Sequence, residues 1–171
     1  MEIQITQDLV QKKSITPNDA GCLQYIEDFL TERGFVNETL TFGRVKNLWS
    51  VKKNKGPVLV FLGHVDVVPT GPENEWEHDP FSGFDDGTFI NGRGTGDMKG
   101  GIACFMSALS RIDVDNLNYS IGFLITADEE GPSKDGTVKV VEELLQRNEK
   151  IDYCLIGEPS TLETVGDNIR I

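Results

Sequence analysis

An unbroken apolar run at residues 58–62, enclosed by turn residues, restricts the fold more than any other feature of the sequence. The turn Lys53-Asn54-Lys55-Gly56 precedes this run, and Gly63 follows it. A short apolar run without polar alternation is typical of a central strand that is covered on both faces. The chain must therefore supply helices for both faces of a sheet.

The rest of the chain alternates between helical and extended patterns. Helices are expected over residues 4–13, from Cys22 to a stop at Gly34, from Ile102 to Ile112, and over residues 137–147; strands are expected over residues 35–42, 48–52, 121–126 and 153–156. Strands that alternate with helices indicate an α/β fold with a largely parallel or mixed sheet.

A long segment, residues 63–101, is rich in Gly, Pro, Asp and Asn and shows little regular pattern. A loop of this length inside a compact domain is usually either functional or disordered. The segment contains Trp76, Phe81 and Phe84, which favours an ordered, functional loop.

Composition excludes several classes of function. The 171 residues suffice for one domain, and a net charge of −12 argues against binding to nucleic acid or to an anionic membrane. No apolar stretch approaches the roughly 20 residues of a membrane span. Cys22, Cys104 and Cys154 lie in apolar stretches without a C-x-x-C pair, so we expect buried free thiols. With no signal peptide at the amino terminus, the expected location is the cytoplasm.

Side chains that suit a metal ion follow the apolar runs. His64 follows the central run, Glu129 and Glu130 follow the strand at residues 121–126, and Glu158 follows the strand at residues 153–156. The carboxyl ends of strands form the crevice in which α/β proteins place their chemistry. Imidazole and carboxylate ligands fit zinc, manganese or cobalt, and zinc is the commonest of these in hydrolysis. The pattern predicts a metallohydrolase.

Asp66 and Asp97 extend this set. Asp66 points the same way as His64 on an extended segment, so its carboxylate is expected to accept a hydrogen bond from the second ring nitrogen. Asp97 lies among five glycines in residues 92–101, whose spacing fits neither the P-loop nor the dinucleotide fingerprint. A rigid turn there would hold a carboxylate that bridges two metal ions. Plainer explanations remain open, because a His-x-Asp tripeptide arises by chance and an acidic run such as residues 128–130 also suits a solvated turn.

Several motifs along the chain occur together in one known family. They are Ser14-Ile15-Thr16-Pro17-Asn18-Asp19, Gly63-His64-Val65-Asp66, Gly92-Arg93-Gly94 with Asp97-Met98-Lys99-Gly100, Asp128-Glu129-Glu130-Gly131, and Gly157-Glu158-Pro159-Ser160. The chain resembles the dinuclear zinc aminoacylase and carboxypeptidase family, most closely its succinyl-diaminopimelate desuccinylase branch. This resemblance implies a three-layer α/β/α zinc-peptidase-like catalytic domain.

The resemblance also implies a role for each site residue. His64, Asp97 and Glu158 would bind one zinc ion, and Asp97 would bridge to a second zinc ion held by Glu130. Asp66 would orient His64, and Glu129 would act as general base and acid. The substrate would be a small N-acyl amino acid: N-succinyl-L,L-diaminopimelate, hydrolysed to succinate and L,L-diaminopimelate for lysine biosynthesis.

Members of that family run about twice this length. The additional part contains a lid, a dimerisation domain through which they form homodimers, and a histidine that completes the zinc ligands. We therefore expect residues 1–171 to be the amino-terminal portion of a single metallohydrolase catalytic domain, with His78 an exposed loop residue rather than a ligand. Two alternatives stay open: a truncated, inactive remnant that still binds metal, and a related aminoacylase, deacetylase or peptidase with another substrate.

Overall fold

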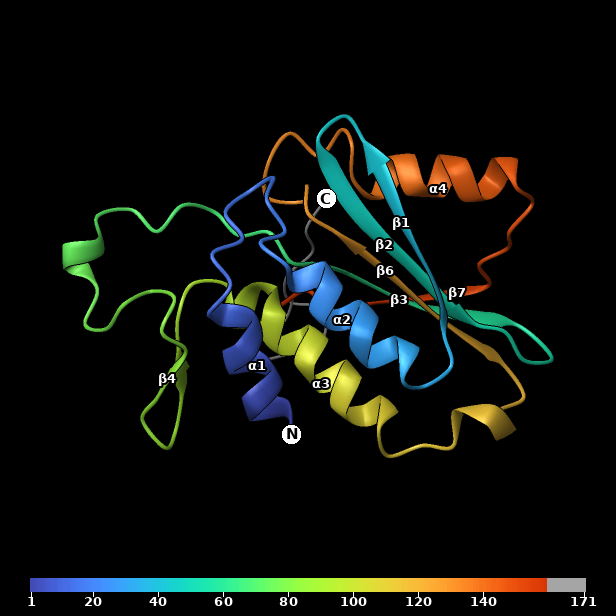
Figure 1. The fold of residues 1–171 in the computed structure, drawn as a ribbon, viewed down its shortest axis with the longest axis horizontal. Helices are drawn as coiled ribbons and strands as arrows, with labels where there is room; N and C mark the ends of the chain where they lie inside the picture. The colour runs from blue at the N-terminus through green and yellow to red at the C-terminus, as the bar shows by residue number, and fades with distance from the viewer. Residues whose placement is uncertain (160–171) are drawn as a thin grey trace.

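Strand β6 (Ser120–Thr126) is buried at every position and lies in the middle of a five-stranded sheet. The computed structural model describes residues 1–159 (Figure 1). The sheet order is β1-β2-β6-β3-β7, and the other strands are β1 (Val36–Phe42), β2 (Val45–Lys52), β3 (Val58–His64) and β7 (Tyr153–Ile156). Strand β2 pairs antiparallel with β1 and β6, whereas β3 pairs parallel with β6 and β7. The sheet is therefore mixed, as expected.

Helices cover both faces of this sheet. Helices α1 (Glu2–Val10), α2 (Cys22–Thr31) and α3 (Gly100–Leu109) lie on one face, and α4 (Thr137–Gln146) lies on the other (Figure 1). Alternate residues of β6 face the two layers: Phe123 belongs to the core beneath α1–α3, and Leu124 packs with Val140 and Leu144 of α4. The predicted three-layer α/β/α architecture is confirmed.

Aromatic side chains fill the larger core. The ring of Phe61 on β3 stacks on Phe105 of α3 with centroids 4.3 Å apart, and Phe35 meets Phe123 edge to face at 5.9 Å. Burial of each such side chain contributes about 1.5–3 kcal/mol to folding. This packing fixes β3 and β6, two of the strands that lead to the predicted site.

The helix boundaries differ in part from those expected. Gly34 follows α2 with a left-handed φ of 75°, as predicted for a glycine stop. Helix α3 ends at Leu109, so its extension to Ile112, which is 45% exposed, was wrong. Helix α1 ends at Val10 rather than residue 13, because the buried Lys99 Nζ donates to the carbonyls of Leu9 at 2.9 Å and Lys12 at 3.0 Å.

The long loop is ordered, with short regular pieces. It contains a 3₁₀ turn at Glu73–Glu75, the paired strands β4 (Phe84–Asp85) and β5 (Ile90–Asn91), and a kinked turn at Thr95–Lys99 in which Asp97 and Met98 have non-helical torsions. Trp76 Nε1 donates to the Thr70 carbonyl at 3.0 Å, and Phe81 is buried. His78, expected to be exposed, is half-buried because its ring lies 3.9 Å from that of Phe84. Within residues 1–159, no helix has the length and apolar character needed to cross a membrane.

The three cysteines differ in exposure. Cys22 is buried at the start of α2, but Cys104 and Cys154 are exposed, which corrects the expectation of three buried thiols. Cys104 lies on the outer side of α3, and Cys154 lies on β7 at the edge of the described sheet. Burial raises the pKa of the Cys22 thiol, so this thiol is also the least reactive.

Thiol labelling tests this arrangement. In native buffer we expect two thiols per chain to react rapidly with a disulfide reagent, and Cys22 to react only after unfolding, because its sulfur is enclosed by the core. Mass spectrometry of the labelled peptides identifies the sites. The Cys104→Ser variant should lose one rapid equivalent, and rapid native labelling of Cys22 would contradict the packing of α2.

Candidate metal and catalytic site

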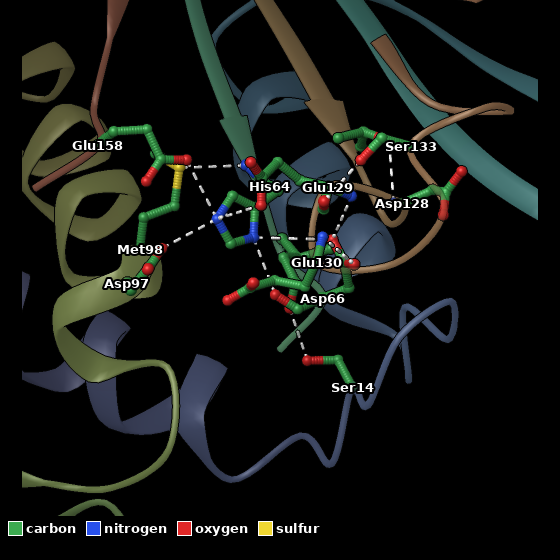
Figure 2. Close-up of polar contacts among 12 residues, drawn as sticks. Ser14, His64, Asp66, Asp97, Met98, Asp128, Glu129, Glu130, Ser133 and Glu158 are labelled. Carbon is green, nitrogen blue, oxygen red and sulfur yellow. Dashed lines mark hydrogen bonds and ion pairs between the residues drawn. The ribbon is translucent and has the colours of Figure 1, made fainter. Parts of the chain in front are cut away.

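The parallel strands bring the predicted side chains to one edge of the sheet. His64 is the last residue of β3, Glu129 and Glu130 follow β6, and Glu158 follows β7. Since β6, β3 and β7 run in the same direction, their carboxyl ends meet at this edge. Figure 2 shows these side chains turned toward one another around the His64 ring.

His64 is the centre of the group. It is 1% exposed, and its Nε2 lies 3.1 Å from Asp97 Oδ1, 3.1 Å from Glu158 Oε1 and 3.8 Å from Glu129 Oε2. Burial by itself would lower the pKa of His64, but the Asp66 carbonyl and the nearby carboxylates outweigh burial and raise this pKa. The structure thus brings Asp97 and Glu158 to the same ring nitrogen, as the predicted ligand set requires.

Glu130 also lies close to this centre. Ligand atoms of His64, Asp97 and Glu130 lie within 4.8 Å of one another, and so do those of His64, Glu129 and Glu158. Both groups contain His64. Glu158 is grouped with Glu129 here, whereas the resemblance assigns Glu158 to the same ion as Asp97. His78 belongs to neither group. Four acidic side chains therefore surround a single imidazole.

The charge of the group suits a cation. Burial, opposed by His64 and reinforced by the carboxylates of Asp97 and Glu129, raises the pKa of Glu158 to about 7. Burial and Asp97 likewise raise the pKa of Glu130. Within the described chain, Glu158 Oε2 is buried without a hydrogen-bond partner. A buried acceptor of this kind requires a partner such as an ion, so these residues fit a bound divalent metal.

Asp66 contacts the site differently from the prediction. The Asp66 main-chain carbonyl, at 2.8 Å, is the hydrogen-bond partner of His64 Nδ1, whereas the carboxylate Oδ1 lies 3.6 Å away. The fully buried carboxylate accepts the main-chain N–H groups of Glu129 at 3.2 Å and Glu130 at 3.1 Å. The main chain of Asp66 therefore orients the imidazole, and its side chain holds the turn that carries both glutamates.

Sequence reasoning missed two supporting residues. Ser14 Oγ donates to the Val65 carbonyl at 2.6 Å and holds the amino-terminal segment beside the chain that leaves β3. Met98 follows Asp97 through a cis peptide bond, and its Sδ accepts the N–H of His64 at 3.2 Å. Both residues stand in motifs that carry the resemblance, but those motifs assigned them no role, because neither residue type by itself indicates these long-range contacts.

Comparison with known proteins identifies the family of this chain. The model of peptidase family M20/M25/M40 matches residues 60–170. The succinyl-diaminopimelate desuccinylase of Marinobacter nauticus is 51% identical over 170 residues, which cover 98% of this chain and 45% of that protein. The enzyme of the same name from Hydrogenovibrio crunogenus is 54% identical over 171 residues, with 98% and 45% covered. The chain thus spans less than half the length of these curated relatives.

The fold of this chain also resembles that of a solved M20 family enzyme. An M20 family metallo-carboxypeptidase from Sulfolobus solfataricus superposes with a TM-score of 0.80 at 22% identity, over 93% of this chain and 37% of that one. The family match covers well over half of the sequence and includes His64, Asp97, Glu130 and Glu158. The chain therefore belongs to peptidase family M20/M25/M40.

Proposed function

We propose that this chain is part of a metal-dependent amide hydrolase that converts N-succinyl-L,L-diaminopimelate and water to succinate and L,L-diaminopimelate. The observation that carries the proposal is the convergence of Asp97 Oδ1 and Glu158 Oε1 on His64 Nε2, each at 3.1 Å. The choice of substrate is supported by relatives of that name at 51% and 54% identity. The reaction would serve lysine biosynthesis in the cytoplasm.

The proposed cofactor is a pair of divalent ions, with zinc favoured over cobalt or manganese. His64, Asp97 and Glu158 would hold the first ion, and Asp97 and Glu130 would hold the second. The mixture of imidazole and carboxylate donors, together with the unpartnered Glu158 Oε2, supports this assignment. When bound, such ions polarise an amide carbonyl and lower the pKa of water.

Glu129 is the proposed general base and acid. Its side chain is 48% exposed, and Oε2 lies 3.8 Å from His64 Nε2, so the carboxylate faces both the site and solvent. It would remove a proton from the attacking water and deliver that proton to the leaving amine nitrogen. The bond from the Glu129 N–H to Asp66 Oδ1, at 3.2 Å, holds its main chain in place for both transfers.

One observation favours the alternative that the isolated chain binds metal without turnover. Tyr153, Leu155 and Ile156 on β7 are 64%, 50% and 57% exposed, and an apolar strand edge of this kind normally packs against further protein. The other alternative, a related aminoacylase, deacetylase or peptidase, has the same proposed metal ligands and differs in the acyl group that it accepts.

Metal removal separates these possibilities. We expect the purified chain to bind divalent zinc, which elemental analysis quantifies, and to lose this zinc and any succinate release when treated with a chelator. Zinc binding without release of succinate would support the inactive remnant. Faster hydrolysis of N-acetyl amino acids than of N-succinyl-L,L-diaminopimelate would support a related acylase. A chain without affinity for zinc would contradict the proposed function.

Substitution of the proposed base tests the mechanism. In an active form of the enzyme, Glu129→Gln should lower kcat by about 10²–10⁴-fold, because the amide cannot accept the proton, while zinc content stays at the wild-type level. Glu142→Gln on the exposed face of α4, where Glu142 pairs with Lys139, is the control and should leave both unchanged. Loss of zinc together with activity in Glu129→Gln would contradict its assignment as base.

Asp66→Asn tests the side-chain contacts of residue 66 while its main-chain contact with His64 is kept. The variant keeps the main-chain carbonyl that binds His64 Nδ1, but one of its two side-chain acceptors becomes a donor facing the amide of Glu129 or Glu130. We expect kcat to fall about 10–100-fold, with the zinc affinity of the His64 site retained. Asp86→Asn is a matched control, since Asp86 Oδ1 accepts the amides of Thr88 and Phe89 in the β4–β5 turn. An equal effect of both substitutions would contradict the proposed role.

A further inference from the structure

The side chain of Met98 lies where three segments of the proposed metal site meet. It is fully buried, and Figure 2 shows it between His64, Asp97 and Glu158. Asp97 is its neighbour in the chain, and the other two residues end or follow strands β3 and β7. One thioether thus lies beside all three residues that would hold the first ion.

The contact with the His64 segment is both polar and steric. Met98 Sδ accepts the His64 N–H at 3.2 Å. A Cβ atom on Gly63 would lie 2.7 Å from Met98 Cε and 3.2 Å from Sδ. At 2.7 Å a Cβ atom would overlap the methyl group, so a glycine before His64 lets the thioether occupy this position.

Met98 also lies close to the main chain just before Glu158. A Cβ atom on Gly157 would lie 2.8 Å from Met98 Cε and 2.8 Å from Phe61 Cζ. The φ angles of Gly63 and Gly157 are not in the left-handed region, so close approach rather than turn geometry explains both glycines. The methyl group of Met98 therefore touches the main chain immediately before two of the proposed ligands.

We propose that Met98 is a positioning residue that sets the relative placement of His64, Asp97 and Glu158, an inference that rests on the proposed metal site. The unbranched thioether fits the narrow space between two glycines, and its sulfur accepts the hydrogen bond of the His64 main chain. A shorter side chain leaves a cavity into which β3 and β7 relax, which changes the distance between the imidazole and the Glu158 carboxylate.

The plain alternative is that Met98 only fills the core. Met106 on α3 provides the matched control, because it is also fully buried in the same hydrophobic core but lies on the helix rather than between the ligand segments. Truncation at either position creates a comparable cavity. A purely structural role for Met98 therefore predicts equal effects of the two substitutions on the site.

The experiment compares zinc binding of four variants by competition with a chromophoric chelator. Met98→Ala should weaken the tightest zinc site about 10–100-fold, the range found when a residue supporting a ligand is lost, and Met98→Leu should show a smaller loss. Met106→Ala and Met106→Leu should bind zinc like the wild type, although thermal unfolding reports a similar loss of stability. The ¹H–¹⁵N resonance of His64 should move in Met98→Leu but not in Met106→Leu.

Each outcome decides the inference. Wild-type zinc affinity and an unmoved His64 resonance in the folded Met98→Leu variant would overturn it, as would equal weakening by the Met98 and Met106 substitutions. If Met98→Ala does not fold, the comparison is made between Met98→Leu and Met106→Leu alone. Failure of the wild-type protein to bind zinc would instead contradict the proposed function, and the His64 resonance would then test the placement by Met98 independently.

Discussion

Parallel pairing of β3 with β6 and β7 is the constraint on which the rest of the structure depends. The register places His64 level with Thr126 and Leu62 level with Ile156, so the residues that follow each strand emerge beside one another. Main-chain hydrogen bonds thereby bring His64, Glu129 and Glu158 together, although they are far apart in sequence. The aromatic core beneath α1–α3 fixes these strands, and the Asp66 carboxylate holds the turn that carries Glu129 and Glu130.

The fold and most of the site were predictable because each depends on local pattern. Unbroken apolar runs identified β3 and β6 as covered strands, and acids that follow such runs identified the crevice. The partner of Asp66 was not predictable, because whether its carbonyl or its carboxylate binds His64 depends on main-chain torsions after β3. The contacts of Met98 and Lys99 were missed for a related reason: both are long-range contacts of side chains that resemble ordinary core or surface residues.

The site places several carboxylates, which repel one another when ionised, in a small volume. The carboxylates of Asp97, Glu129, Glu130 and Glu158 face one buried imidazole. Burial, together with the nearby carboxylates of Asp97 and Glu129, raises the pKa values of Glu130 and Glu158. Other acids of the described chain form ordinary ion pairs, as in Arg147 with Glu38 and Glu143. Unfavourable interactions of this kind, in a fold whose other interactions are favourable, are typical of a functional site.

The amino-terminal segment has a bearing on protein engineering. Main-chain bonds from Val67 N–H to the Ser14 carbonyl at 2.9 Å and from Thr16 N–H to the Val67 carbonyl at 3.0 Å pair residues 14–16 with the chain just beyond His64. Thr16 also lies beside the acidic turn, since a Cβ atom on Gly131 would be 2.8 Å from its Oγ1. A fusion partner or affinity tag inserted at residues 14–16 would therefore perturb the imidazole of His64, the proposed metal ligand, whereas one attached before α1 would lie a helix away from it.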